Sequence, residues 1–196
     1  MLIYMSSFNT FLEYYRNNEV KLNESPMRIG RSLGEDLDNS WYNVETSKEI
    51  INSCSLIDNE CPLNTVMNLY RDEYSDNKIM DHWVTEQPFI GCYYIFQNVD
   101  GGLQSLGVWN HQQYKGSARI LLFSYYLKKY DFIISDNKHT TQGETFWKNI
   151  IKMATKDSYK VTVLGRTGKE FDIDDVDSYW GNRNEFADYK IKIYKK

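Results

Sequence analysis

The spacing of apolar residues is most regular in the second half of the chain, after Pro88. The continuous apolar and aromatic run Phe89–Phe96 has the length and composition of a buried central strand. Asp100 and Gly101 then provide turn chemistry, and Leu103–Trp109 returns as a second apolar segment. The pattern therefore predicts two strands that form an antiparallel hairpin.

Helices and strands are predicted to alternate after this hairpin. Apolar residues recur at helical spacing within 118–129, and Phe132–Ile134 follows as a short buried strand. A second helix is predicted to begin at Thr140 or Thr141, with Glu144 placed for a capping box. The apolar face of this helix consists of Phe146, Trp147, Ile150 and Ile151.

This order of elements predicts an α/β (α+β) protein with a mixed, mostly antiparallel central sheet flanked by helices. Two further strands, Val161–Leu164 and Tyr189–Tyr194, complete the order on either side of a turn sequence at residues 166–169. The length favours a single domain over residues 1–196. Within it, residues 89–196 are expected to form the core and residues 1–88 a helical or irregular portion that faces an acceptor or a partner.

The first 88 residues show weaker patterns. Helical spacing predicts a helix at Ser7–Asn17, and the turn-rich residues 21–43 are expected to form a loop. A capping signal at Thr46 or Ser47 predicts a short helix. Pro62 predicts the start of another, because it precedes apolar residues at helical spacing, namely Leu63, Val66, Met67 and Tyr70.

Composition narrows the class of function. The net charge of −4 and the isoelectric point near 5.4 argue against nucleic acid as a partner, since phosphate backbones are bound by an excess of Lys and Arg. The three cysteines lack the paired spacing of zinc sites, and no metal site is predicted. The sequence shows neither a secretory signal nor a membrane-length apolar window, so we expect a cytoplasmic protein with reduced thiols and no membrane partner.

The most specific candidate chemistry lies between the hairpin and the helix that follows it. From Gln113 to Ala118 the sequence reads Gln-x-x-Gly-x-Ala. A strand that turns through small residues into a helix leaves backbone N–H groups pointing the same way, at the positive end of the helix dipole. Gly116 would permit close approach of a ligand. The segment therefore predicts a cradle for a pyrophosphate group.

The motif and the order of elements over about residues 89–165 together resemble the Gcn5-related N-acetyltransferase superfamily, possibly a divergent phage-encoded member. The signature of that family is Arg or Gln, two residues, Gly, one residue, then Gly or Ala, and Gln113, Gly116 and Ala118 fill these places. The resemblance implies an acyl-coenzyme A N-acyltransferase-like fold, acetyl-coenzyme A as the acyl donor, and an amine on a protein or small molecule as the acceptor. It also implies the residues that hold the pyrophosphate: Gln113, Tyr114, Lys115, Gly116, Ser117, Ala118 and Arg119.

The resemblance further implies where the thioester lies. In the family a splayed pair of parallel strands opens a notch for it, and the corresponding segments here are Leu103–Trp109 and Phe132–Ser135. Backbone near Val108 and Trp109 would then hold the acyl carbonyl.

Three polar residues are candidate catalytic groups. His111 precedes the cradle and is a candidate base, although an exposed loop histidine is also commonly just solvated. Asp136 or Glu144 would activate the acceptor, because they follow a buried strand on the side where open α/β sheets bind ligands; the alternative is a loop with a helix cap. The family often has a Tyr that protonates the leaving thiolate, but Phe146 and Trp147 stand where it is expected.

Two functions follow from these features. The first is an acyl-coenzyme A-dependent N-acyltransferase whose acceptor is held by the segment before Pro88. The second is a non-catalytic, phage-type accessory protein on the same scaffold that binds a host protein, in an anti-defence or virion role. The missing Tyr and the irregular first half favour the second. A third function, modification of DNA bases, conflicts with the acidic isoelectric point.

Overall fold

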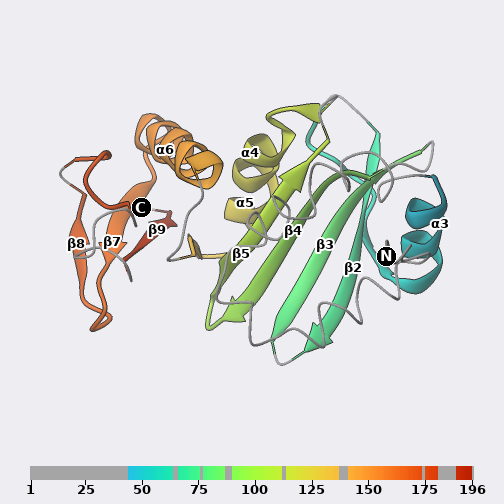
Figure 1. Ribbon diagram of the computed structural model, residues 1–196, viewed down its shortest axis with the longest axis horizontal. Coiled ribbons are helices and arrows are strands. Elements are labelled where there is room, and N and C mark those ends of the chain that lie inside the picture. Colours follow the sequence, from blue (N-terminus) through green and yellow to red (C-terminus); the bar gives the residue numbers. More distant parts are fainter. Residues whose placement is uncertain are drawn as a thin grey trace, which may run out of the picture.

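The computed structural model describes residues 44–63, 66–75, 77–86, 90–111, 114–136, 141–173, 175–180 and 189–195. These residues form one continuous nine-stranded sheet with helices packed against it (Figure 1). The helix predicted at Ser7–Asn17 and the loop predicted for residues 21–43 lie outside the described residues.

The order of strands across the sheet is β1-β2-β3-β4-β5-β6-β9-β7-β8. Neighbouring strands are antiparallel except β5 and β6, which are parallel. The predicted mixed, mostly antiparallel sheet is thus confirmed. The strands are β1 (Ser55–Asp58), β2 (Met67–Ser75), β3 (Lys78–Thr85), β4 (Ile90–Val99), β5 (Gly102–Asn110), β6 (Phe132–Ile134), β7 (Lys160–Leu164), β8 (Glu170–Asp172) and β9 (Lys190–Tyr194). The helices are α3 (Val44–Ser53), α4 (Ser117–Leu121), the π-helical η3 (Leu122–Tyr126), α5 (Leu127–Lys129) and α6 (Thr141–Lys156).

The elements predicted after Pro88 are confirmed. β4 and β5 form the expected antiparallel hairpin, and β4 is a buried central strand. The predicted first helix runs continuously through α4, η3 and α5, and β6, α6, β7 and β9 follow in the predicted order. The sequence pattern missed β8, a strand of three residues that pairs with β7 across the predicted turn.

The helix predicted from Pro62 is wrong, because this segment leads into strand β2. Helical spacing of its apolar residues was coincidental. Met67 and Leu69 alternate along β2 and are fully buried in the main core. The residues before Pro88 therefore contribute β1, β2 and β3 to the sheet, where a helical or irregular portion was expected. The short helix predicted at Thr46 or Ser47 is confirmed as α3.

The main core lies between one face of the sheet and the helices α4, η3 and α6. Aromatic rings fill its centre: the centroid of the Tyr126 ring lies 4.9 Å from that of Tyr94 and 4.8 Å from that of Phe96. α3 packs in a second, smaller cluster, in which Ile50 meets residues of β2, β3 and β4. The helices that precede β6 (α4, η3 and α5) and the helix that follows it (α6) therefore pack in the same main core.

A buried polar network joins the sheet to η3. Asp81 is fully buried and accepts two hydrogen bonds from Arg71, from Nε at 2.6 Å and from Nη2 at 2.9 Å. The Tyr126 hydroxyl donates to Asp81 Oδ2 at 2.9 Å and accepts from Trp83 Nε1 at 3.2 Å. The hydroxyl therefore satisfies a buried carboxylate and a buried indole at once.

Candidate functional site

The parallel strands β5 and β6 pair over three positions, Gly102–Gln104 with Phe132–Ile134. Beyond them β5 stays paired with β4 up to Asn110. On its other edge β6 pairs with β9, and this pairing continues past β6, since the Ser135 N–H donates to the Ile191 carbonyl at 2.8 Å and the Ile191 N–H donates to Ser135 Oγ at 2.9 Å. Among the described residues the β5–β6 ladder ends at Gln104 and Ile134, and we call the region between the two strands beyond these three pairs the β5/β6 notch.

A β-bulge in β5 lies beside this notch. Ile95 of β4 pairs with Gly107, but Phe96 pairs with Ser105, so Leu106 is left without a partner in the β4 register. A bulge increases the local twist and bends its strand. The bulge thus occurs just after the last residue of β5 that pairs with β6.

The connection from β5 to α4 is short and held by backbone hydrogen bonds. The His111 N–H donates to the Gly91 carbonyl and the Tyr114 N–H to the His111 carbonyl, both at 2.9 Å. Gly116 then takes the left-handed conformation, with φ 91°, and the helix begins at Ser117. A residue with a Cβ is strained in this conformation, which explains the glycine.

The start of α4 suits an anion. Gly116 at the N-cap position provides no side-chain cap, and the first turn carries no acidic residue. A Cβ on Gly116 would lie 3.3 Å from the guanidinium of Arg119, so this cation folds back over the first turn. Lys115 is exposed beside it. Helix dipole and side-chain charges therefore favour negative charge at the same place.

The first turn of α4 is attached to the sheet through strand β4. Ser117 and Ala118 are buried, and the Tyr94 hydroxyl of β4 donates a hydrogen bond to the Ala118 carbonyl. The Cys92 thiol lies nearby, and burial raises its pKa well above the ordinary value. Cys92 is therefore a protonated core thiol at neutral pH rather than a nucleophile.

Most residues predicted to bind the donor lie at the cradle or beside it. Residues 114–119 form the turn and the start of α4, whereas Gln113 lies outside the described residues. Val108 is buried in the main core below α4. Trp109 points to the other face of the sheet, where its ring stacks on Tyr93 with centroids 5.7 Å apart.

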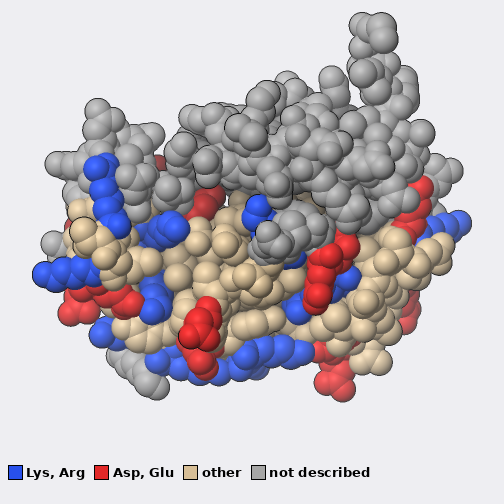
Figure 2. Space-filling view, turned by 90° about the horizontal axis from the view of Figure 1, so that it is seen from below, with Lys and Arg blue, Asp and Glu red and all other residues tan. Residues whose placement is uncertain are grey.

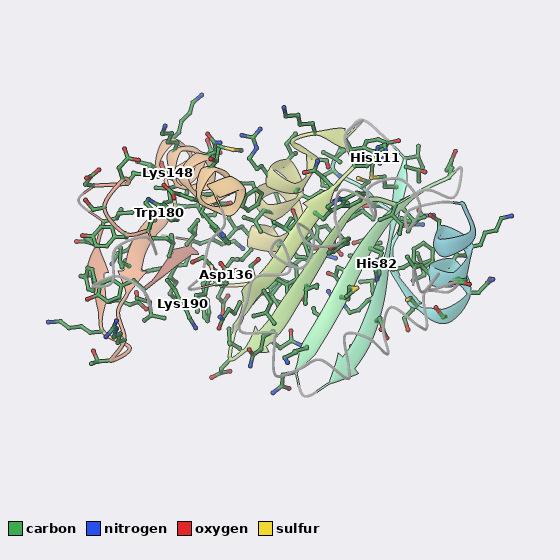
Figure 3. The ribbon with its side chains drawn as sticks, in the orientation of Figure 1. His82, His111, Asp136, Lys148, Trp180 and Lys190 are labelled. Carbon is green, nitrogen blue, oxygen red and sulfur yellow. The ribbon has the colours of Figure 1, made fainter. Side chains whose placement is uncertain are left out.

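The three candidate catalytic residues lie apart from one another. Asp136 follows β6 at the β5/β6 notch, whereas His111 follows the end of β5 and contacts the Trp109 ring (Figure 3). Continuing the β5/β6 register brings Asp136 level with Leu106, and His111 follows Leu106 by five residues, which is roughly 15 Å along the strand. Asp136 is therefore the candidate at the notch.

Glu144 lies on α6 and takes part in an ion-pair cluster. Lys148 Nζ lies 2.7 Å from Glu144 Oε1 and 2.5 Å from Asp177 Oδ1, and it stands 5.7 Å from the centre of the Trp180 ring (Figure 3). This cluster ties the start of α6 to the segment that follows β8. The geometry gives Glu144 a structural partner on its own helix.

Sequence reasoning missed two polar residues at the notch. Lys190 of β9 reaches past the end of β6, and its Nζ donates to Gln104 Oε1 of β5 at 3.2 Å. Continuing the β6/β9 register past Ser135 brings Lys190 level with Asp136. The alternation along β9 predicted a polar face that includes Lys190, but the contact joins residues 86 positions apart, which no local pattern reveals.

Surface charge and comparisons with known proteins do not identify a class. Figure 2 shows basic and acidic side chains side by side on the face that it presents. Among the described residues, no three His, Cys, Asp or Glu gather in a way that could hold a metal ion, and no helix combines the length and apolarity needed to cross a bilayer. No family model matches the chain, and searches of curated proteins and of solved structures give no match.

Proposed function

We propose that this protein is an acyl-coenzyme A-dependent N-acyltransferase of the Gcn5-related type. One observation supports the proposal most directly: the parallel strand pair of the described sheet parts beside a glycine-led helix start that favours an anion. A ligand that joins a pyrophosphate to a long, uncharged arm fits this combination. The pyrophosphate would lie at the cradle, and the arm would enter the β5/β6 notch.

The residues have separate parts in this proposal. Backbone N–H groups at Ser117 and Ala118, together with Arg119, would bind the pyrophosphate. Backbone near Val108 and Trp109 would orient the thioester carbonyl. Asp136 would accept the proton that the attacking amine loses, directly or through water.

The acyl transfer itself needs few further catalytic groups from the protein. The amine nitrogen attacks the thioester carbonyl, a C–N bond forms, and the C–S bond breaks as the thiolate leaves and takes a proton from water. Such a step depends mainly on positioning and on a deprotonated amine. A tyrosine on the helix after β6 is therefore not a strict requirement, and Phe146 and Trp147 are compatible with the proposal.

Calorimetric titration with acetyl-coenzyme A tests the cradle. Gly116→Val should weaken binding at least about tenfold, since a side chain at φ 91° would strain the turn and displace Arg119. Gly168→Val is the matched control, because Gly168 has a similar φ of 77° but lies in the β7–β8 turn with no atom within 4 Å of its would-be Cβ. Absence of binding to the wild type at millimolar acetyl-coenzyme A, or full affinity in Gly116→Val, would contradict the proposal.

A feature of strand β1 favours the second candidate function, a non-catalytic binding protein. β1 is the outer strand of the sheet, and its Leu56 and Ile57 are 56% and 41% exposed; Val66, just before β2, is 59% exposed. An edge strand with exposed apolar residues offers backbone and side-chain contacts to another chain. A host partner that is lost on Leu56→Lys, combined with no acyl transfer, would favour this function.

A further inference from the structure

The two edge strands of the sheet, β1 and β8, differ in the side chains that they expose. Among the described residues, three of the four exposed large apolar side chains lie on β1 or just before its neighbour β2: Leu56, Ile57 and Val66. β8 instead carries the carboxylates of Glu170 and Asp172. Charged residues on an edge strand discourage pairing with another chain, whereas exposed apolar residues favour it. β1 is therefore the edge at which another strand can add.

The sequence of β1 is compatible with pairing to the same strand of a second copy. Antiparallel pairing of two identical strands creates a two-fold axis, and the residue on the axis faces its own counterpart. With Leu56 on the axis, leucine faces leucine, and Ser55 faces Ile57 of the second copy. Asp58 then lies opposite Cys54 of the second copy. In this register no carboxylate of β1 faces another.

The other edge strand does not tolerate the same arrangement. A two-fold axis at Phe171 pairs all three residues of β8, and it places Glu170 of each copy opposite Asp172 of the other. Like charges directly opposite each other destabilise a strand pair. Symmetric pairing is therefore favourable at β1 and unfavourable at β8. A two-fold contact that uses one edge of each copy ends at two copies.

We propose that the protein forms a two-fold symmetric dimer in which β1 pairs with β1 of a second copy, with Leu56 on the axis. The two nine-stranded sheets would then form one continuous sheet. The inference goes beyond the proposed function and does not depend on it. β5, which leads into the cradle, is the fourth strand beyond β1 in the order of the sheet, so the cradle of each copy lies outside this interface.

The pairing involves few residues, so the association should be weak. The register of β1 and β2 is interrupted between Leu56 and Asp58, and Ile57 has no partner in β2. Such a bulge bends an edge strand and limits the length over which it can pair regularly. Interfaces that bury less than about 1,200 Å² are typical of weak complexes. We therefore expect a dimer that dissociates on dilution through roughly the micromolar range.

Sedimentation velocity of the full-length protein tests the dimer, over concentrations from about 5 to about 500 µM. The weight-average mass of the wild type should rise from 23.3 kDa towards twice that value. Leu56→Lys and Leu56→Glu should each weaken association at least about tenfold, because like charges then face each other on the axis. An equimolar mixture of the two variants should associate again, because lysine then faces glutamate across the axis.

Ile120→Lys is the matched control. Ile120 is an exposed apolar residue of similar size, 45% exposed, and it lies on α4 rather than at the edge of the sheet. This variant should associate within about twofold of the wild type. Leu56 is exposed as well, so the two Leu56 variants should keep the circular dichroism spectrum of the wild type.

Three results would overturn the inference. The first is a wild type that stays monomeric at every concentration. The second is a dimer that both Leu56 variants form as tightly as the wild type does, because the contact would then lie elsewhere. The third is a mixture of the two Leu56 variants that stays as monomeric as each variant alone, because β1 would then not face itself across an axis. A monomeric wild type whose β1 binds a different protein would favour the second candidate function instead.

Discussion

Removal of the single Tyr126 hydroxyl group should measurably destabilise the fold, because two buried partners depend on it. It donates to the fully buried Asp81 and accepts from the indole N–H of Trp83, whose side chain is also fully buried. Tyr126→Phe deletes one oxygen atom and leaves the ring in place against Tyr94 and Phe96. The change therefore isolates two hydrogen bonds from the packing.

The magnitude follows from those two bonds. A hydrogen bond to a charged group contributes about 1.5–3 kcal/mol, and a buried donor left without an acceptor costs about 1–3 kcal/mol. Both effects come from one oxygen and are not fully additive, so we expect the free energy of unfolding to fall by about 2–4 kcal/mol. Asp81 keeps both hydrogen bonds from Arg71, which limits the loss.

Tyr125→Phe is the matched control, one residue earlier in η3. The Tyr125 hydroxyl accepts a hydrogen bond from Lys129, a half-exposed side chain that also binds Asp58, and the hydroxyl itself is hydrogen-bonded to the Asp58 carboxylate. A surface contact of this kind contributes about 0–1 kcal/mol. The two variants therefore differ in hydrogen-bond burial and hardly at all in volume.

Urea unfolding followed by circular dichroism measures the difference. With an m-value of about 2 kcal/mol/M, Tyr126→Phe should lower the midpoint by roughly 1–2 M, and Tyr125→Phe by less than about 0.5 M. The m-value should not change. If the free energies of unfolding of the two variants differ by less than about 0.5 kcal/mol, the buried hydrogen bonds of Tyr126 do not stabilise the fold more than the surface contact of Tyr125 does.

Two further predictions concern other parts of the sheet. Hydrogen bonds from Lys129 and from the Glu60 N–H hold the pKa of Asp58 at about 2. The ionised carboxylate should therefore contribute its full stabilisation of the folded state above about pH 4, and this contribution should be lost as the pH falls through about 2. Lys129→Gln should raise the Asp58 pKa measured by NMR titration, and an unchanged pKa would contradict the assignment. Gly102→Ala should lower the free energy of unfolding by about 1–3 kcal/mol, because its Cβ would lie 2.6 Å from the Phe132 backbone carbonyl. Gly165→Ala, whose Cβ would lie 3.3 Å or more from its neighbours, should cost less than about 1 kcal/mol, and equal costs would argue against a rigid β5/β6 contact.

The sequence predicted the C-terminal half of the fold well because its elements carry their own apolar faces. The fully buried run in β4 and the helical spacing from Ala118 to Lys129 are local signals. β3 lacks such a signal, since the fully buried Asp81 interrupts its apolar run. That burial is possible only with Arg71 and Tyr126 in place, residues 10 and 45 positions away, so no local pattern predicts it.

One part of the candidate site could be predicted from a local sequence motif, and another part could not. Gly116 and the helix start at Ser117 follow from a local motif and are found as expected. The Lys190–Gln104 contact depends on β9 lying between β6 and β7, an insertion that places the last described strand inside the sheet and not at its edge. The spacing of residues in the sequence does not predict that β9 lies next to β6.

The same insertion gives the chain after β6 a partner strand on the side away from β5. A strand edge left open inside a sheet is normally costly, because its N–H and C=O groups lose their partners. After β6, however, Ser135 meets Ile191 through two hydrogen bonds, and β5 continues to pair with β4 as far as Asn110. Each side of the notch thus has a partner strand on its outer side, while Gly102 holds the two strands in close contact at the base. The outward-facing backbone groups on both sides are therefore paired, whereas the β5 residues beyond Gln104 have no partner in β6 on the side that faces the notch.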